Sequence, residues 1–100
     1  MAKAFGLWLK EYEGESWRAQ YAAKKWRHSL RNDYLQPSQY ETEADIQLRL
    51  RLFYGEQRHV PLGVATAWLE WRAEQRVNAL KANGQYEKAE RLAQELFRDS

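Results

Sequence analysis

Residues 42–54 read TEADIQLRLRLFY, and this stretch decides the fold class. Apolar side chains stand at every second position from Ile46 to Tyr54, which is typical of a strand. The start of the stretch instead favours a helix, because Thr42 suits an N-cap and Glu43 suits the first helical turn. We therefore predict a helix here and keep a strand as the alternative.

A strand in this stretch would need a second strand beside it, since a lone strand is not stable. Residues 5–12 also alternate between apolar and polar side chains and are the candidate for pairing. The alternative fold is therefore α+β, with a two-stranded element from residues 5–12 and 46–54. The preferred fold is all-α, a single compact domain over residues 1–100 with four to five helices.

Three further stretches show helical periodicity, over residues 15–32, 61–82 and 85–98. Pro61 suits a first helical position, and Asn83 with Gly84 supplies the left-handed residue that ends a helix. The short connection predicts that the last two helices form an antiparallel hairpin at the end of the chain. The apolar faces predict a core of Trp26, Leu30, Leu48, Leu52, Leu69, Val77, Leu80, Leu92, Leu96 and Phe97.

Residues 83–89, with Ala93 and Leu96 after them, resemble the turn and second helix of a tetratricopeptide repeat. Proteins of that family bind peptides in a groove built from at least three tandem repeats of about 34 residues. No second copy is visible here, and Arg76 and Val77 stand where the family has a Leu-Gly pair. The resemblance implies an antiparallel helical hairpin and no function.

The composition excludes several classes of function. The chain has no cysteine, which rules out disulfides, zinc–thiolate sites, iron–sulfur clusters and thiol catalysis. Its two histidines, His28 and His59, have no further metal ligand at a suitable spacing, and no phosphate-binding loop or nucleophile elbow occurs. We therefore expect no catalytic residue, no cofactor and no metal, and a protein that is not an enzyme.

Similar reasoning predicts where the protein is located and whether it enters a membrane. No run of about 18 apolar residues exists, and the N-terminus lacks the apolar region of a secretory signal. We expect a cytoplasmic protein that does not use a membrane. With 44% hydrophobic and 30% charged residues, the chain has the composition of a folded globular protein.

The helix predicted over residues 15–32 has a second face opposite its alanine stripe. On one arc of this face lie Trp17, Tyr21, Lys24, His28 and Arg31, with Arg27 beside them. Rings interleaved with cations suit an acidic protein partner, and they also suit a nucleic-acid strand. The structural interpretation is that Trp17 and Tyr21 pack on residues 5–12 while the cations face water.

The helix predicted over residues 61–82 is also apolar on two faces. Trp68 and Trp71 lie opposite its main leucine stripe, and Arg72 and Arg76 flank that stripe. A helix of this kind is either buried between two layers or presents one face to a partner or a second copy of the chain.

We predict a small non-enzymatic protein that binds another macromolecule as an adaptor, regulator or inhibitor. A protein is the preferred partner, a nucleic acid bound by the face between Trp17 and Arg31 is the alternative, and self-association stays open. The predicted partner-binding residues are Trp17, Tyr21, Lys24, Arg27, His28, Arg31, Trp68, Trp71, Arg72 and Arg76.

Overall fold

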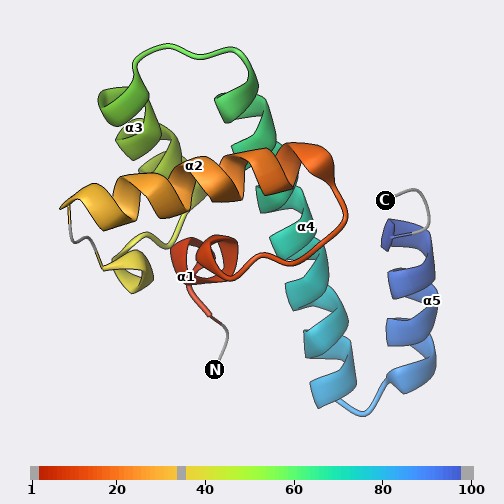
Figure 1. Cartoon of the computed structure of the whole chain (residues 1–100). Coiled ribbons are helices and arrows are strands. Elements are labelled where there is room, and N and C mark those ends of the chain that lie inside the picture. Colours follow the sequence, from red (N-terminus) through yellow and green to blue (C-terminus); the bar gives the residue numbers. More distant parts are fainter. Residues whose placement is uncertain (1–2, 34–35, 98–100) are drawn as a thin grey trace. The chain divides into compact units, whose positions relative to one another are not determined.

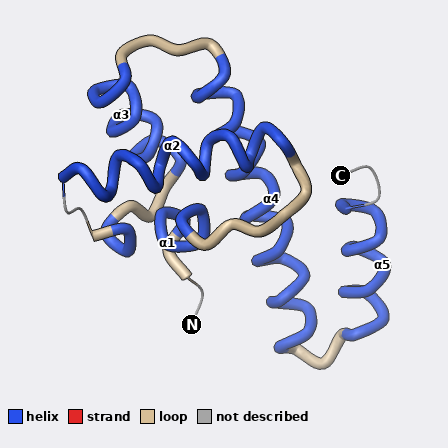
Figure 2. Tube along the Cα trace, viewed as in Figure 1, coloured by secondary structure: helices blue, strands red, loops and turns tan. Residues whose placement is uncertain are grey.

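Helices joined by short loops make up the described part of the chain (Figures 1 and 2). The structure is a computed structural model that describes residues 3–33 and 36–97. Its elements are α1 (Phe5–Lys10), α2 (Trp17–Asp33), the short 3₁₀ helix η1 (Pro37–Gln39), α3 (Glu43–Tyr54), α4 (His59–Ala82) and α5 (Tyr86–Phe97). No strand occurs within the described residues. The all-α prediction is confirmed and the α+β alternative is wrong.

The stretch that decides the fold is a helix because its first turn is capped from both sides. The Thr42 hydroxyl accepts a hydrogen bond from the Asp45 backbone N–H at 3.3 Å. In return the Asp45 carboxylate accepts one from the Thr42 backbone N–H at 3.2 Å. This capping box satisfies backbone donors that the start of a helix otherwise leaves without a bond.

Helical geometry then divides the alternating apolar residues of α3 between two opposite sides. Ile46 and Leu50 are buried, whereas Leu48 is 59% exposed and Leu52 is 73% exposed. Positions two apart lie about 200° apart around a helix, so burying Ile46 and Leu50 turns Leu48 and Leu52 outward. The prediction that Leu48 and Leu52 belong to the core is therefore wrong.

Residues 5–12 form α1 and the turn after it instead of a strand. Phe5 and Leu9, one helical turn apart, are fully buried. The Gly6 backbone N–H donates to the Tyr40 carbonyl oxygen at 2.6 Å. A Cβ atom on Gly6 would meet the Pro37 carbonyl oxygen and Tyr40. Glycine is thus what lets α1 lie directly against η1 and the residue after it.

The alanine stripe of α2 packs closely against α4. Ala19, Ala22 and Ala23 are fully buried. A Cβ atom on Gly63 of α4 would meet the Arg18 carbonyl oxygen and lie 2.9 Å from the Ala22 Cβ. The two backbones approach so closely here that only small residues fit between them. The prediction that this stripe faces a neighbouring helix agrees with this packing.

Contacts within the chain divide it into two units, residues 1–68 and 69–100, and each is described by itself. In the second unit, the Gly84 N–H donates to the Lys81 carbonyl at 3.0 Å, and the Gln85 N–H donates to the Leu80 carbonyl at 2.9 Å. Gly84 has a φ of 77° there and ends α4 in the way the sequence predicted. The predicted hairpin is confirmed, whereas the single domain over residues 1–100 stays a prediction.

The remaining core predictions had mixed outcomes. Trp26, Leu30 and Val77 are buried as predicted, and Leu80 and Leu92 are half-buried. Leu69 is 66% exposed, so its assignment to the core is wrong. In the first unit α4 buries the side that carries Val60, Val64 and Ala67. The side chains of Leu96 and Phe97 lie outside the described residues.

The close approach of the two backbones at Gly63 predicts that Gly63→Ala will not stabilise the protein. In an open helix this change would favour folding by about 1 kcal/mol through helix propensity. Here the added methyl group meets Arg18 and Ala22, and overpacking costs about 1–3 kcal/mol. We expect the free energy of unfolding, measured by urea denaturation, to fall by up to about 2 kcal/mol and not to rise. Asn78→Ala on an exposed position of α4 is the control and should cause no loss. Stabilisation by Gly63→Ala would contradict this packing.

Candidate binding surface on helix α2

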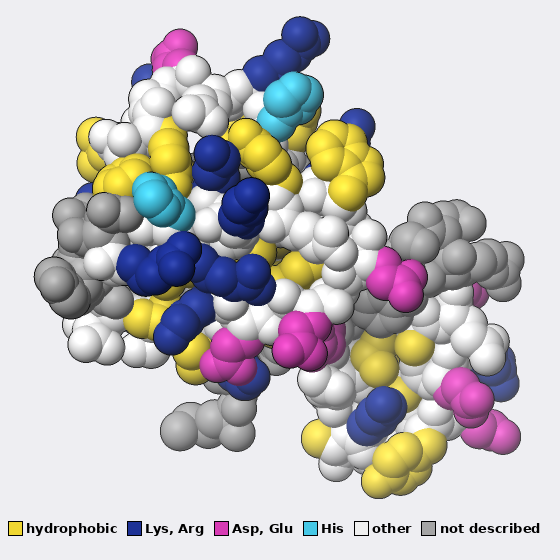
Figure 3. All heavy atoms as spheres, viewed as in Figure 1, with side chains coloured by type: hydrophobic (Ala, Val, Ile, Leu, Met, Phe, Trp, Pro, Cys, Tyr) yellow, Lys and Arg dark blue, Asp and Glu magenta, His cyan; other side chains and the backbone are white. Residues whose placement is uncertain are grey.

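Positively charged side chains predominate on α2 between Trp17 and Arg31. From Trp17 to Arg31 the helix has five Lys or Arg residues and no Asp or Glu. The alanine stripe and Trp26 face inward, so the longer side chains project outward. In Figure 3, Lys, Arg and His side chains gather on the visible face of this part of the molecule. We call the group Trp17, Tyr21, Lys24, Lys25, His28 and Arg31 the α2 face.

Trp17 stands at the beginning of this face and is 62% exposed. The Arg18 guanidinium carbon lies 5.3 Å from the centre of its ring, within cation–π distance. Most of the indole therefore faces solvent and is not covered by residues 5–12. An exposed tryptophan of this kind is a typical anchor for a binding partner.

The middle of the α2 face is braced by the end of α3. The Lys25 ammonium lies 5.5 Å from the Tyr21 ring centre and 5.1 Å from that of Tyr54. The Tyr54 hydroxyl donates a hydrogen bond to the Lys25 carbonyl oxygen at 3.1 Å. Burial raises the pKa of Tyr54 above its ordinary value, so the phenol keeps its proton and this bond to a higher pH than an exposed tyrosine would.

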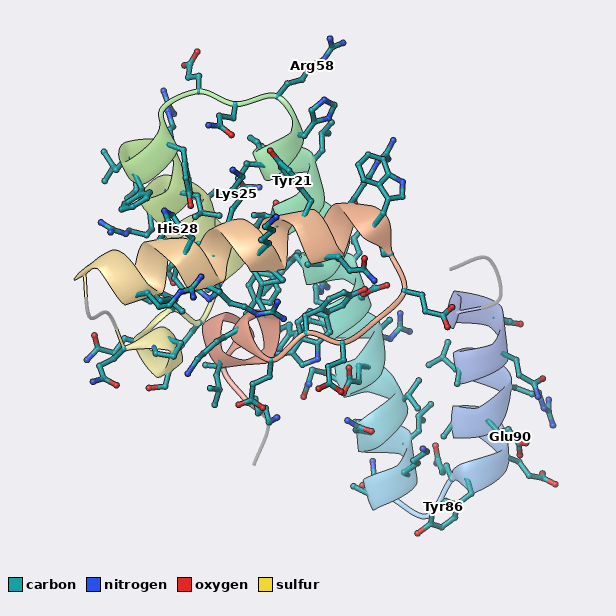
Figure 4. All side chains as sticks on the ribbon, in the orientation of Figure 1. Tyr21, Lys25, His28, Arg58, Tyr86 and Glu90 are labelled. Carbon is teal, nitrogen blue, oxygen red and sulfur yellow. The ribbon has the colours of Figure 1, made fainter. Side chains whose placement is uncertain are left out.

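His28 continues the same cluster one turn further along α2. Its ring centre lies 6.0 Å from that of Phe53 and 6.1 Å from that of Tyr54. Figure 4 shows Tyr21, Lys25 and His28 along one side of α2. Lys25 is half-buried beside these rings, whereas His28, Lys24 and Arg31 are exposed. The ring contacts of His28 and Lys25 limit their side-chain motion before any partner arrives.

Lys25 is a member of this face that the sequence analysis missed. The prediction was drawn from positions centred on the arc through Trp17, Tyr21 and His28. Lys25 follows Tyr21 by four residues, and side chains four apart on a helix are neighbours. That spacing was the available signal, whereas the second ring, Tyr54, comes from a distant part of the sequence and could not have been found in this way.

Arg27 has a structural role. Its Nε donates to the Lys10 carbonyl oxygen at 2.6 Å, and one of its terminal nitrogens donates to the Tyr12 carbonyl oxygen at 2.7 Å. These bonds tie the chain that leaves α1 to the middle of α2. The guanidinium is thus turned toward the protein's own backbone.

The four predicted residues of α4 do not belong to the α2 face. Trp68, in the first unit, is half-buried and meets the Phe5 ring edge-on at a centre distance of 5.0 Å. Trp71, Arg72 and Arg76 lie in the second unit, where Trp71 is half-buried and the two arginines are exposed. The structure therefore gathers Trp17, Tyr21, Lys24, His28 and Arg31 of the predicted set on one surface.

The described part of the chain has neither a metal-binding cluster nor a membrane-spanning helix. Residues 3–33 and 36–97 contain no group of three or more His, Asp or Glu side chains that could hold a metal ion. None of the described helices is long and apolar enough to cross a membrane. No protein-family model, curated protein or solved structure gives a significant match to the chain.

The different environments of Arg27 and Lys24 predict different effects on stability. We expect Arg27→Ala to lower the free energy of unfolding by about 1–3 kcal/mol, because it removes two hydrogen bonds from a charged donor. Lys24→Ala, on an exposed position, should change it by less than about 0.5 kcal/mol. Chemical denaturation of both variants checks this. Equal effects at the two positions would show that the Arg27 bonds do not hold the fold.

Proposed function

We propose that this chain acts without a reaction of its own, by binding an acidic protein partner through the α2 face. The observation that carries the proposal is the α2 face, which combines three cations, Lys24, Lys25 and Arg31, with a largely exposed indole. No carboxylate occurs between Trp17 and Arg31. Binding of this kind suits an adaptor, regulator or inhibitor, which works by recruiting its partner or by covering part of it.

The cationic and the aromatic side chains of the α2 face have different roles in binding. Lys24 and Arg31, exposed at the surface, attract an acidic partner over several ångströms and orient it. Trp17 then loses its contact with water, which favours the bound state through the hydrophobic effect. Lys25 and His28 are already restricted by neighbouring rings, so ordering them on binding costs little entropy.

The balance of exposed surfaces favours a protein over a nucleic acid. A nucleic-acid strand is held by stacking successive bases on open aromatic rings. On the α2 face, Trp17 is largely exposed, whereas the Tyr21 ring is half-buried and has Lys25 beside it. Exposed leucines on α3, the helix that packs against α2, suit the surface of a protein and have no role in contacting phosphates.

A nucleic acid is the second candidate, and the absence of acidic residues between Trp17 and Arg31 favours it. The two candidates differ in their response to salt. Phosphate contacts release counterions, so nucleic-acid binding would weaken steeply between about 50 and 200 mM salt. The cytoplasm remains the expected location, and a second copy of the chain remains a partner that the same experiment would detect.

The test is capture of partners from lysate by the tagged chain, with and without nuclease. Lys24→Glu combined with Arg31→Glu should reduce recovery of the protein partner at least about tenfold, because two attractive charges become repulsive. Lys81→Glu combined with Arg91→Glu, at exposed positions of α4 and α5, makes the same charge change and is the matched control.

Three results would contradict the proposal. Recovery unchanged by both double variants would show that the α2 face is not the binding surface. Equal losses in both would show that total charge, rather than this face, determines binding. Material that disappears on nuclease treatment would replace the protein partner with a nucleic acid.

A further inference from the structure

A groove with a volume of about 710 Å³ lies between α3 and the beginning of α4. It is formed by residues of α3 from its exposed side round to buried Leu50, by the loop from Gly55 to Arg58 and by the first residues of α4. All of these belong to the first unit. The residues that matter for its chemistry are Leu48, Arg51, Glu56, Arg58, Val60 and Pro61.

The base of the groove is apolar and one wall is uncovered. Leu50 and Val60, which both line it, are buried within the protein. Leu48 also lines it and is 59% exposed. An aliphatic side chain left open beside an apolar base favours a partner that brings apolar side chains of its own.

A hydrogen bond between the two helices sets the width of the groove. The Gln47 side-chain amide donates to the Pro61 carbonyl oxygen at 2.9 Å. This bond joins the middle of α3 to the first turn of α4, and Gln47 and Pro61 both line the groove. The bond therefore joins the two walls of the groove before any ligand binds.

The charged residues around the groove favour an acidic occupant. Arg51 and Arg58 line it together with one acidic residue, Glu56. The Arg51–Glu56 distance is 3.6 Å, and both side chains are mostly exposed, so this ion pair contributes little. Arg51 can exchange Glu56 for a carboxylate of a partner at small cost. Arg58 is exposed and projects from the loop in Figure 4.

We propose that this groove receives an amphipathic helix of a partner protein, with apolar side chains in the groove and Asp or Glu beside Arg51 and Arg58. Helices bound in this way present apolar residues at positions i, i+3 or i+4, and i+7. The volume lies in the upper part of the range for pockets that enclose a ligand, which leaves room for more than one side chain. The inference rests on the proposed function in one respect, that the partner is a protein, and it does not use the α2 face.

The test is a selection from a display library of random 16-residue peptides against the full chain. We expect the enriched peptides to place apolar residues at helical spacing and to carry an excess of Asp and Glu. Leu48→Gln should weaken their binding about tenfold or more, because a buried contact is removed. Leu52→Gln is the matched control, since Leu52 is exposed on the same helix and does not line the groove. Arg58→Gln should weaken binding and reduce its dependence on salt.

Circular dichroism and thermal unfolding of both leucine variants would establish that they fold equally well, as expected for exposed positions. Peptides without helical spacing, peptides rich in Lys and Arg, or binding that is equal in Leu48→Gln and Leu52→Gln would each overturn the inference. So would a selection that enriches no peptide.

The two proposals fail in different ways. If both the peptides and the partner from lysate bind the Lys24→Glu/Arg31→Glu variant normally, the α2 face proposal is overturned and the groove proposal is retained. If Leu48→Gln leaves both peptides and partner bound while the α2 variant loses the partner, the groove proposal is overturned and the α2 face stands.

Discussion

The hydrogen bond between the Trp26 indole and the backbone of Gly6 is the constraint on which the first unit depends. Trp26 is fully buried, and its Nε1 donates to the Gly6 carbonyl oxygen at 2.8 Å. Its ring meets that of Tyr40 edge-on at 4.9 Å, and the Gly6 N–H bonds to the Tyr40 carbonyl. Three segments that are distant in the sequence thus meet at one side chain. Without the indole, a buried carbonyl would lose its donor, which is costly in a dry interior.

That constraint also fixes how α2 is rotated about its own axis. With Trp26 turned toward α1 and the alanines turned toward α4, the remaining arc must carry the long polar and aromatic side chains. The α2 face is therefore a consequence of core packing as well as of its own sequence. The contacts of His28 and Lys25 with rings of α3 add rigidity to a surface that a solvated helix would leave mobile.

The sequence was sufficient to predict the four longer helices, but not α1, which it offered only as a candidate strand, and not the rotation of each helix about its axis. The capping residues Thr42 and Asp45 act within one helical turn, so a helix could be predicted there despite the alternating pattern. Which of Ile46 and Leu48 faces inward depends on packing between helices, and no local signal decides it. The hairpin could be predicted, because Asn83 and Gly84 form their turn from adjacent residues.

The candidate site shows the same division between local and distant information. Trp17, Tyr21, Lys24, His28 and Arg31 share an arc through helical spacing alone and could be grouped in advance. The hydrogen bonds of Arg27 could not be predicted, because its acceptors are backbone carbonyls. Every residue has a backbone carbonyl, so the sequence does not indicate which ones accept a bond. The groove could not be predicted from residues 55–58 either, because its shape depends on the distance between α3 and α4.

The position of Arg27 affects how fast a partner associates with α2 but not how long the complex lasts. Its hydrogen bonds point into the protein, but its positive charge still contributes to the electrostatic field outside α2. An approaching acidic molecule would be attracted by this charge without touching it. Arg27 would then act on the association rate constant, while the dissociation rate constant would depend on the side chains that the partner contacts.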